Sequence, residues 1–186
     1  MFRQHARIRL LQSAAVPSGD GPPPSTPFPD RYNDSDDGVY RWTFERRWGP
    51  GELLCWIGLN PRGGEPFSGR RPTLAKVQRW ATTWGLDGVI VVNLFAYRST
   101  DPRHLRVAAV DIIGPGNDEI INGAAAQCPV VLGAWGAGGR LHRRGAEVAA
   151  MIPDMFCLGT TRRGEPRHPL YVAQATTKIP YTRPLA

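Results

Sequence analysis

Short, largely apolar segments alternate along the chain with segments that carry apolar residues at helical spacing. Apolar segments of strand length occupy residues 53–59, 89–95, 129–135 and 155–158. Helical patterns lie between them, from Thr73 to Gly85, from Asn117 or Asp118 onward, and over residues 141–150. Strands that are apolar on both faces are typical of a parallel sheet covered by helices on each side. The alternation therefore predicts an α/β fold, a three-layer α/β/α sandwich with a mostly parallel central sheet.

The first 38 residues differ in composition from the rest of the chain. Residues 17–27 are rich in proline, glycine and serine and are typical of a linker. Alternating polar and apolar residues over 39–44 predict a strand. We therefore expect a flexible N-terminal segment over residues 1–38 and a single α/β domain over residues 39–186.

Composition narrows the class of protein. No run approaches the ~18 consecutive apolar residues of a membrane span, so we expect no membrane partner. Cys55, Cys128 and Cys157 lie far apart in apolar surroundings, which argues against a disulfide framework and against a zinc site. Buried, reduced thiols and the lack of a convincing secretion signal predict a cytoplasmic protein. We expect a monomer without metal or cofactor.

The charged residues are dominated by arginine. Lysine and arginine together number 23 against 16 acidic residues, a formal net charge of +7, and only Lys76 and Lys178 are lysines. The planar guanidinium group binds phosphates and base edges through paired hydrogen bonds, and clustered arginines are typical of nucleic-acid binding. A high-GC genome, which encodes basic residues as arginine, explains the same composition. The two explanations differ in whether the arginines gather on one face.

Polar side chains follow the predicted parallel strands. Asn60 comes after the first strand, Asn93 lies near the end of the second, and His168 lies in the loop after the fourth. Ligands of parallel sheets bind at the carboxyl ends of the strands. An amide donates and accepts at once, as a base edge requires, Phe67 offers a ring for stacking, and an imidazole stabilises charge on a leaving group. We expect these four side chains to line one pocket for a nucleobase.

Some of these residues have simpler interpretations. Asn60 before a proline can shape a turn, and Phe67 can be a core residue. Asn93 and His168 favour function, because asparagine is disfavoured in strands and a loop histidine seldom belongs to the core. The glycine-rich segment 133–139 can cradle a phosphate, and close packing of a helix on a strand explains its glycines equally well.

The order of these motifs resembles that of the uracil-DNA glycosylase superfamily. The similar stretches are Gly58-Leu59-Asn60-Pro61, Pro66-Phe67-Ser68-Gly69-Arg70, Val91-Val92-Asn93, Leu132 to Gly136 with Arg143-Arg144-Gly145, and His168-Pro169-Leu170. They span about residues 53–171, most of the expected domain. The resemblance implies a uracil-DNA glycosylase-like fold, DNA as the partner, and hydrolysis of an N-glycosidic bond.

The resemblance also implies a role for each matching residue. Asn60 and His168 would be catalytic, the first positioning the attacking water and the second stabilising the departing base anion. Phe67 would stack on the base and Asn93 would read its edge. The full base-binding set would be Gly58, Pro61, Phe67, Asn93, Pro169 and Leu170, and the set for the nucleic-acid backbone Arg62, Arg70, Arg143, Arg144 and Arg167. A base in a duplex must first be flipped out of the stack.

The chain departs from the superfamily at several positions. Asn60 stands where the most active branches have aspartate, so it cannot act as a base and slow catalysis is expected. Leu170 replaces the serine of the last motif, and Arg62 stands where one branch has an aromatic residue. Three scattered cysteines cannot supply the four-cysteine iron–sulfur cluster of the thermostable branch.

The chain is also similar, on a tighter set of motifs, to a bacterial family known only as a domain of unknown function. These motifs are Leu59-Asn60-Pro61, Val91 to Arg98, Asp101-Pro102, Gly114 to Asp118, Ala134 to Gly136 and Gly164 to Tyr171. We expect a DNA-repair hydrolase, a monofunctional DNA glycosylase acting on single-stranded or damaged DNA. The alternatives are a non-catalytic module that binds a modified base or a strand end, and an enzyme acting on free nucleosides or nucleotides.

Overall fold

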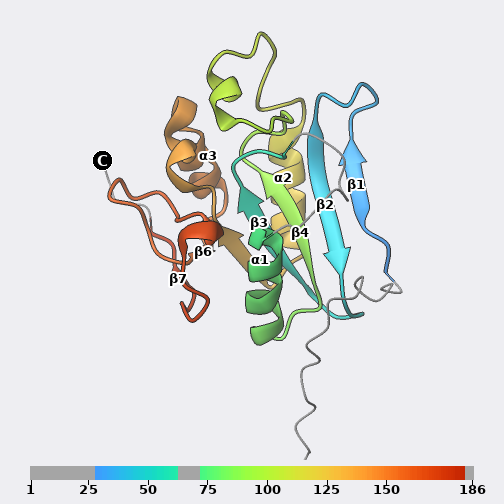
Figure 1. Cartoon of the computed structure of the whole chain (residues 1–186), viewed down its shortest axis with the longest axis vertical. Coiled ribbons are helices and arrows are strands. Elements are labelled where there is room, and N and C mark those ends of the chain that lie inside the picture. The colour runs from blue at the N-terminus through green and yellow to red at the C-terminus, as the bar shows by residue number, and fades with distance from the viewer. Residues whose placement is uncertain (1–27, 63–71, 183–186) are drawn as a thin grey trace, which may run out of the picture.

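A computed structural model describes residues 28–62 and 72–182, which form a mixed α/β fold (Figure 1). Its strands are β1 (Arg31–Asp34), β2 (Arg41–Arg47), β3 (Leu53–Gly58), β4 (Gly88–Asn93), β5 (Val130–Gly133), β6 (Phe156–Cys157) and β7 (Ile179–Pro180). Its α-helices are α1 (Pro72–Thr83), α2 (Asn117–Ala126) and α3 (Arg144–Met151). Three short 3-10 segments are η1 (Pro102–Arg106), η2 (Gly136–Arg143) and η3 (Pro169–Tyr171).

The strands in the described part of the chain form one seven-stranded sheet in the order β1-β2-β4-β3-β5-β6-β7. The four central strands β4, β3, β5 and β6 run parallel, whereas β1, β2 and β7 pair antiparallel with their neighbours. Strand β3 is buried along its whole length, as its continuous apolar sequence predicts. The expected α/β fold with a mostly parallel central sheet is confirmed, and antiparallel strands occupy both edges.

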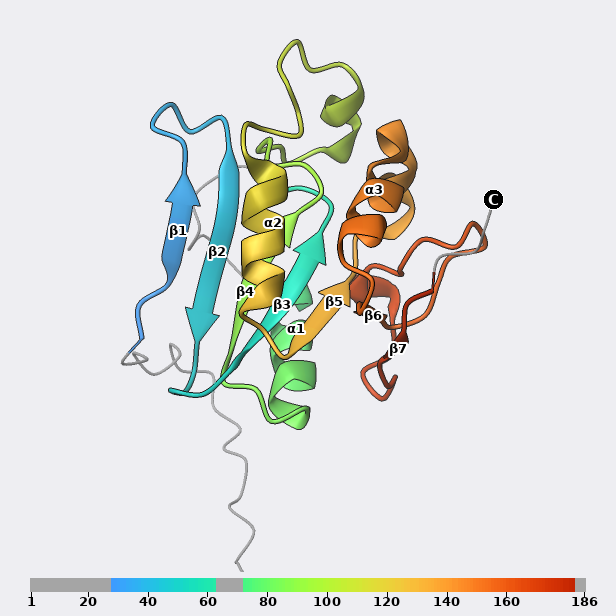
Figure 2. The same cartoon turned by 180° about the vertical axis from the view of Figure 1, so that it is seen from behind.

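The helices cover both faces of the sheet (Figures 1 and 2). On one face, Leu74, Val77 and Trp80 of α1 join a hydrophobic cluster with the strands. On the other face, Ile121 of α2 and Val148 of α3 belong to a second cluster. The two clusters are the two halves of the core, and the sheet lies between them as the middle of three layers.

The sheet begins earlier in the chain than the composition predicts. Residues 31–34, grouped from their composition with the N-terminal segment, form the edge strand β1, antiparallel to β2. Arg41 of β2 donates from Nε and Nη2 to the two carboxylate oxygens of Asp34, at 2.6 and 2.7 Å. An edge strand held by such pairs needs no apolar alternation, so the boundary expected at residue 39 lies inside the sheet.

The third α-helix begins later than its expected start at residue 141. His142 and Arg143 have φ angles of 50° and 60°, in the left-handed region. Left-handed residues cannot continue a right-handed helix. The segment before Arg144 therefore forms the separate 3-10 element η2, and α3 ends at Met151.

All three cysteines lie among the described residues. Cys55 and Cys157 are buried and Cys128 is half-buried, and all three are free thiols. Burial raises the pKa of the Cys55 thiol well above its ordinary value. Within residues 28–62 and 72–182, no helix is both long and apolar enough to pass through a bilayer, and no cluster of three or more histidine, cysteine or acidic residues is placed to hold a metal.

Candidate functional site

A cavity of about 1160 Å³ opens where the carboxyl ends of β3, β4 and β5 meet. The connection after β3 passes through α1 on one face of the sheet, and the connection after β4 passes through α2 on the other face (Figures 1 and 2). Adjacent parallel strands whose connections leave to opposite faces create a crevice at their carboxyl ends. The topology of the chain therefore determines where this cavity lies. We refer to this cavity, at the carboxyl ends of β3, β4 and β5, as the main cavity.

Most residues of the expected site line the main cavity. They are Gly58, Asn60, Pro61, Arg62, Asn93, Arg167, His168 and Leu170. Pro169 is buried behind the histidine at the start of η3 and does not line the cavity. Phe67 and Arg70 lie outside the described residues. Three of the four side chains expected in one pocket are therefore brought together, from the ends of two strands and a late loop.

Asn93 ends β4 and is only 6% exposed. It is in register with Gly58 of β3, and its Oδ1 lies 2.6 Å from the position that a Cβ on Gly58 would occupy. The side chain of Asn93 therefore lies over the backbone of Gly58, in space that the side chain of any residue other than glycine would fill. Within the described residues, the carboxamide of Asn93 has no hydrogen-bond partner. Asn93 lines the main cavity, so a ligand there can pair with both the donor and the acceptor of its amide.

Two buried side chains hold the backbone at the end of β4. Asn117, the first residue of α2, donates from Nδ2 to the carbonyl oxygens of Asn93 and Leu94, at 3.1 and 3.2 Å. Arg144 donates from Nε to the carbonyl oxygen of Leu94 at 3.0 Å. These bonds fix the strand end that presents Asn93. The sequence identifies Asn117 as a possible helix start and as part of the Gly114 to Asp118 motif, without predicting this contact.

The expected role of Arg144 on a nucleic-acid backbone is wrong. Its side chain is 2% exposed and forms ion pairs with Asp118 and Glu147. An arginine enclosed in this way ties α2 to α3 and to β4, and it does not reach a phosphate outside. Arg143 is exposed but does not line the main cavity.

Asn60 follows β3 and is anchored by its amide nitrogen. Nδ2 donates to the carbonyl oxygens of Ser99 and Pro61, at 2.9 and 3.1 Å. Both partners are acceptors, so the nitrogen must face them, and Oδ1 is the remaining acceptor of the amide. Asn60 therefore shapes the turn, as its simpler interpretation predicts, and still presents an amide oxygen in a residue that lines the cavity.

His168 precedes η3, and its hydrogen bond fixes its tautomer. Nδ1 accepts a hydrogen bond from the backbone N–H of Leu170 at 3.3 Å, so the proton of the neutral ring is on Nε2. Burial lowers the pKa of the imidazole, which favours this neutral form. A Cβ on Gly136, where φ is 70°, would lie 3.3 Å from Cβ of His168, so this glycine allows the loop to approach β5. The result is a neutral imidazole with an Nε2–H donor.

Trp56, in the middle of β3, is a cavity residue that the sequence did not reveal. Its indole lines the main cavity, and Nε1 is buried without a hydrogen-bond partner in the part of the chain that the structure describes. The strand is apolar throughout, so the pattern predicts only a core residue there. The signal in the sequence was the indole N–H itself. A buried tryptophan N–H usually needs a hydrogen-bond partner, and the apolar strand around Trp56 supplies none.

The charge around the main cavity has one sign. Arg62, Arg162 and Arg167 line it, and none of its described lining residues is acidic. Arg41 also lines it but is paired with Asp34. A concave surface with this charge attracts anions and ligands rich in acceptors.

The glycines that follow β5 serve packing. A Cβ on Gly138 would meet the side chain of Leu59 at 2.5 Å, and one on Gly139 would meet Trp135 at 2.2 Å. Contacts this close leave no room for any other residue. Of the two interpretations of this glycine-rich segment, the structure supports close packing.

Fold and cavity together define a mixed α/β protein with a basic, amide-lined cavity at the carboxyl ends of a parallel sheet. The family model described as "Protein of unknown function (DUF1643)" matches residues 41–170, and the chain belongs to this family. The matched range runs from β2 through η3 and so contains every described residue of the expected site. Membership of a family of unknown function, expected from the motifs, is confirmed. No curated protein and no solved structure matches the chain.

Proposed function

We propose that this protein binds a flipped-out or single-stranded nucleobase of DNA in the main cavity and hydrolyses its N-glycosidic bond, as a divergent member of the uracil-DNA glycosylase superfamily. The observation that carries the proposal is the pairing of Asn93 with His168. A carboxamide without a hydrogen-bond partner among the described residues and a neutral imidazole with a proton on Nε2 line the same cavity. These are the two groups that recognition and departure of a base require.

Recognition rests on the amide and on the apolar wall beside it. The carboxamide of Asn93 donates and accepts at once, and a bidentate amide–base pair discriminates against the wrong base by about 1–3 kcal/mol. Phe44, Trp56 and Leu74 line the same cavity and offer apolar surface to a flat ring. The cavity volume of about 1160 Å³ exceeds what one base fills, leaving space for the attached sugar and phosphate.

The chemistry needs stabilisation of charge on the leaving group. In hydrolysis the bond between C1′ and the base nitrogen breaks, its electron pair stays on the base, and the oxygen of water bonds to C1′. One proton of that water passes to solvent, and the departed base takes up a proton from solvent. Nε2–H of His168 donates a hydrogen bond to the base as negative charge develops, without transferring the proton.

Asn60 orients the attacking water in this reaction. With Nδ2 bound to two carbonyl oxygens, Oδ1 is the atom that accepts a hydrogen bond from the attacking water. An amide oxygen orients water but does not remove its proton, so turnover is slow.

A non-catalytic nucleobase-binding module is the second candidate, and one observation favours it. No carboxylate lines the main cavity among the described residues, so no group there acts as a general base. Such a module binds the same base through Asn93 and releases no product.

The test is a set of oligonucleotides that contain uracil, hypoxanthine, xanthine or an alkylated base, incubated with the protein and then cleaved with alkali at abasic sites. We expect abasic product from at least one base. Asn93→Ala is expected to lower the rate of excision by about tenfold to a hundredfold, since it removes the bidentate contact. His168→Ala is expected to lower the rate while base-specific binding stays within a few-fold.

Asn122→Ala is the matched control, because Asn122 is an exposed asparagine on α2. It is expected to behave as the unmodified protein. Full excision by Asn93→Ala would contradict the proposal. Base-specific binding without abasic product would assign the protein to the non-catalytic alternative.

A further inference from the structure

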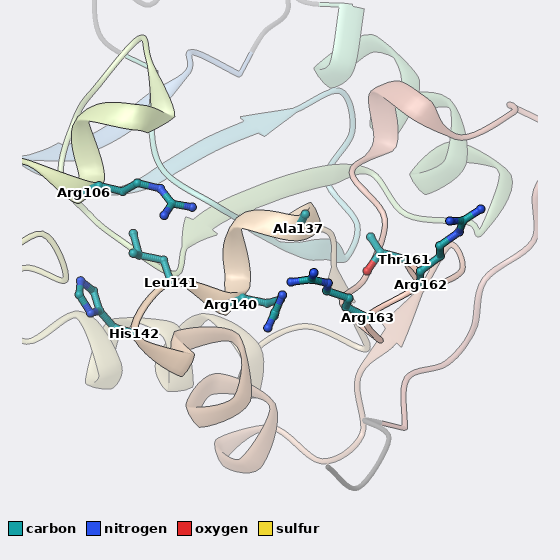
Figure 3. A pocket seen from close by; sticks show the side chains of 8 residues that line it. All are labelled: Arg106, Ala137, Arg140, Leu141, His142, Thr161, Arg162 and Arg163. Carbon is teal, nitrogen blue, oxygen red and sulfur yellow. The ribbon is translucent and has the colours of Figure 1, made fainter.

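A second cavity, of about 630 Å³, adjoins the main cavity and is lined chiefly by basic side chains (Figure 3). Four arginines contribute to it, Arg106, Arg140, Arg162 and Arg163. Ala137, Thr161 and Arg162 line both cavities, so the two are neighbours that share a wall. We refer to this second cavity, defined by its four arginines, as the arginine pocket.

The described residues do not compensate the charge in the arginine pocket. None of its described lining residues is acidic, and none of the four arginines forms an ion pair within the described residues. A guanidinium group does not lose its proton at any physiological pH. Four positive groups in one concave surface therefore create a potential that attracts an anion.

The four side chains come from three separate segments. Arg106 ends η1, Arg140 lies in η2, and Arg162 and Arg163 lie in the loop after β6. Figure 3 shows Arg140 and Arg163 reaching toward one another, with Arg106 extending toward them from η1. Arg162 projects away from this group, on the side of the main cavity. The charges are spread along a path and do not converge on one point.

The backbone beside the pocket has an unusual conformation. His142 and Arg143 are consecutive left-handed residues, a conformation that is strained for any residue other than glycine. The turn that they form keeps His142 in the lining of the pocket, while Arg143 is excluded from it. Strain of this kind persists where the surrounding structure enforces it, and it is concentrated at functional sites.

We propose that the arginine pocket binds phosphodiester groups of the same DNA strand whose base enters the main cavity. The inference rests on the proposed function, because it takes the occupant of the main cavity to be a nucleotide. A phosphate is the anion that arginine binds bidentately. Charges spread from Arg162 to Arg106 match consecutive phosphates of a strand better than the compact phosphates of a free nucleotide. The substrate is therefore a polymer, bound through at least one nucleotide beyond the base.

The salt dependence of binding tests this assignment. The protein is titrated with a single-stranded thymidine oligonucleotide of about 12 nucleotides at several salt concentrations. Each single-strand phosphate contact contributes about 0.7 to the slope of log affinity against log salt. The double variant Arg140→Gln/Arg163→Gln is expected to lower the slope by about 1.4 and to weaken binding roughly 25-fold at about 0.1 M salt.

The matched control is Arg31→Gln/Arg79→Gln. It removes the same charge from two exposed arginines, on β1 and α1, that line neither cavity. The control is expected to keep the slope within about 0.3 of the unmodified protein. Equal losses in both double variants, or an unchanged slope in Arg140→Gln/Arg163→Gln, would overturn the assignment.

A second arm uses thymidine triphosphate in place of the oligonucleotide. Loss of triphosphate binding in Arg140→Gln/Arg163→Gln, with oligonucleotide binding retained, would overturn the strand assignment and give the pocket to a free nucleotide. Asn93→Ala separates this inference from the proposed function, because it is expected to abolish base preference while the salt slope is kept. A slope that depends on Arg140 and Arg163 in a protein without any base preference would support the phosphate site and contradict the base site.

Discussion

The β1–β2 edge and the lining of the two cavities at the carboxyl ends of the same sheet both carry arginines, but most of those in the lining have no acidic partner among the described residues. On β2, Arg41 pairs with Asp34, Arg46 with Asp30 and Arg47 with Glu45. Arg41 also lines the main cavity. The other arginines that line the two cavities form no ion pair within the described residues; they are Arg62, Arg106, Arg140, Arg162, Arg163 and Arg167. One set of arginines holds secondary structure together, and the described residues leave the charge of the other set uncompensated.

This division bears on the origin of the arginine-rich composition. A high-GC genome explains why the basic residues are arginines, but it does not explain why the described residues supply acidic partners at one edge and none in the lining of the cavities. Six described arginines without an ion-pair partner line the two cavities. Removing an acidic partner from a paired arginine is expected to lower the stability of the fold. Removing an unpaired arginine at the cavities is expected to leave stability nearly unchanged.

The largest expected effect is on stability, at the most deeply buried arginine of the ion pairs. Asp118→Ala leaves Arg144, which is 2% exposed, without its closest carboxylate. An uncompensated buried charge is strongly unfavourable, so we expect the free energy of unfolding to fall by about 3 kcal/mol, measured by urea denaturation. Glu147→Ala is the control, since this partner is 3.5 Å away and more than half exposed, and it is expected to cost about 0.5 kcal/mol or less. Equal losses of unfolding free energy in the two variants would show that Asp118 is not the main partner of Arg144.

An intermediate effect is expected at the β1–β2 edge. Asp34→Ala removes the carboxylate shared by Arg41 and Arg98, and we expect a loss of about 1–2 kcal/mol in the free energy of unfolding. Arg163→Gln, on the unpaired side, is expected to change stability by less than about 0.5 kcal/mol. Thermal and urea denaturation of the two variants measure this difference. If Arg163→Gln proved as destabilising as Asp34→Ala, the distinction between the two sets of arginines would be lost.

The smallest expected effect is a pH dependence set by His168. Its pKa is lowered in the folded protein, so below about pH 6.5 the unfolded chain binds more protons at this residue than the folded chain does. The contribution of His168 to stability is therefore complete above that pH and is lost as the pH falls. We expect the melting temperature to decline less steeply on acidification in His168→Gln than in the unmodified protein. A steeper decline in the variant would contradict the assignment of Nδ1 as an acceptor.

The central sheet and its helices could be predicted from the sequence because short segments of the chain determine them. Continuous apolar strands and amphipathic helices specify a covered parallel sheet, and a parallel sheet sends its carboxyl ends to one edge. Asn60, Asn93 and His168 could therefore be expected together without any knowledge of distances. The same reasoning does not reach β1, whose polar sequence forms a strand through its pairing with β2 and the contact of Asp34 with Arg41.

The rest of the site depends on contacts between distant segments. Arg143 and Arg144 are adjacent and chemically identical, yet one is exposed and the other is buried by its contacts with Asp118 and Leu94. Trp56 has the sequence environment of a core residue, and only the topology shows that its indole reaches a cavity. Arg106 and Arg140 come to one pocket from segments more than thirty positions apart, which no spacing in the sequence encodes.

The bare backbone at Gly58 has a consequence for comparing relatives. Oδ1 of Asn93 lies 2.6 Å from the position that a Cβ on residue 58 would take, so a side chain there forces the amide to shift. A relative that carries alanine or anything larger at the position of Gly58 is therefore expected to hold its amide elsewhere or to have none. The glycine–asparagine pair is thus a criterion by which family members can be sorted, before any assay, into those that can place an amide as this chain does and those that cannot.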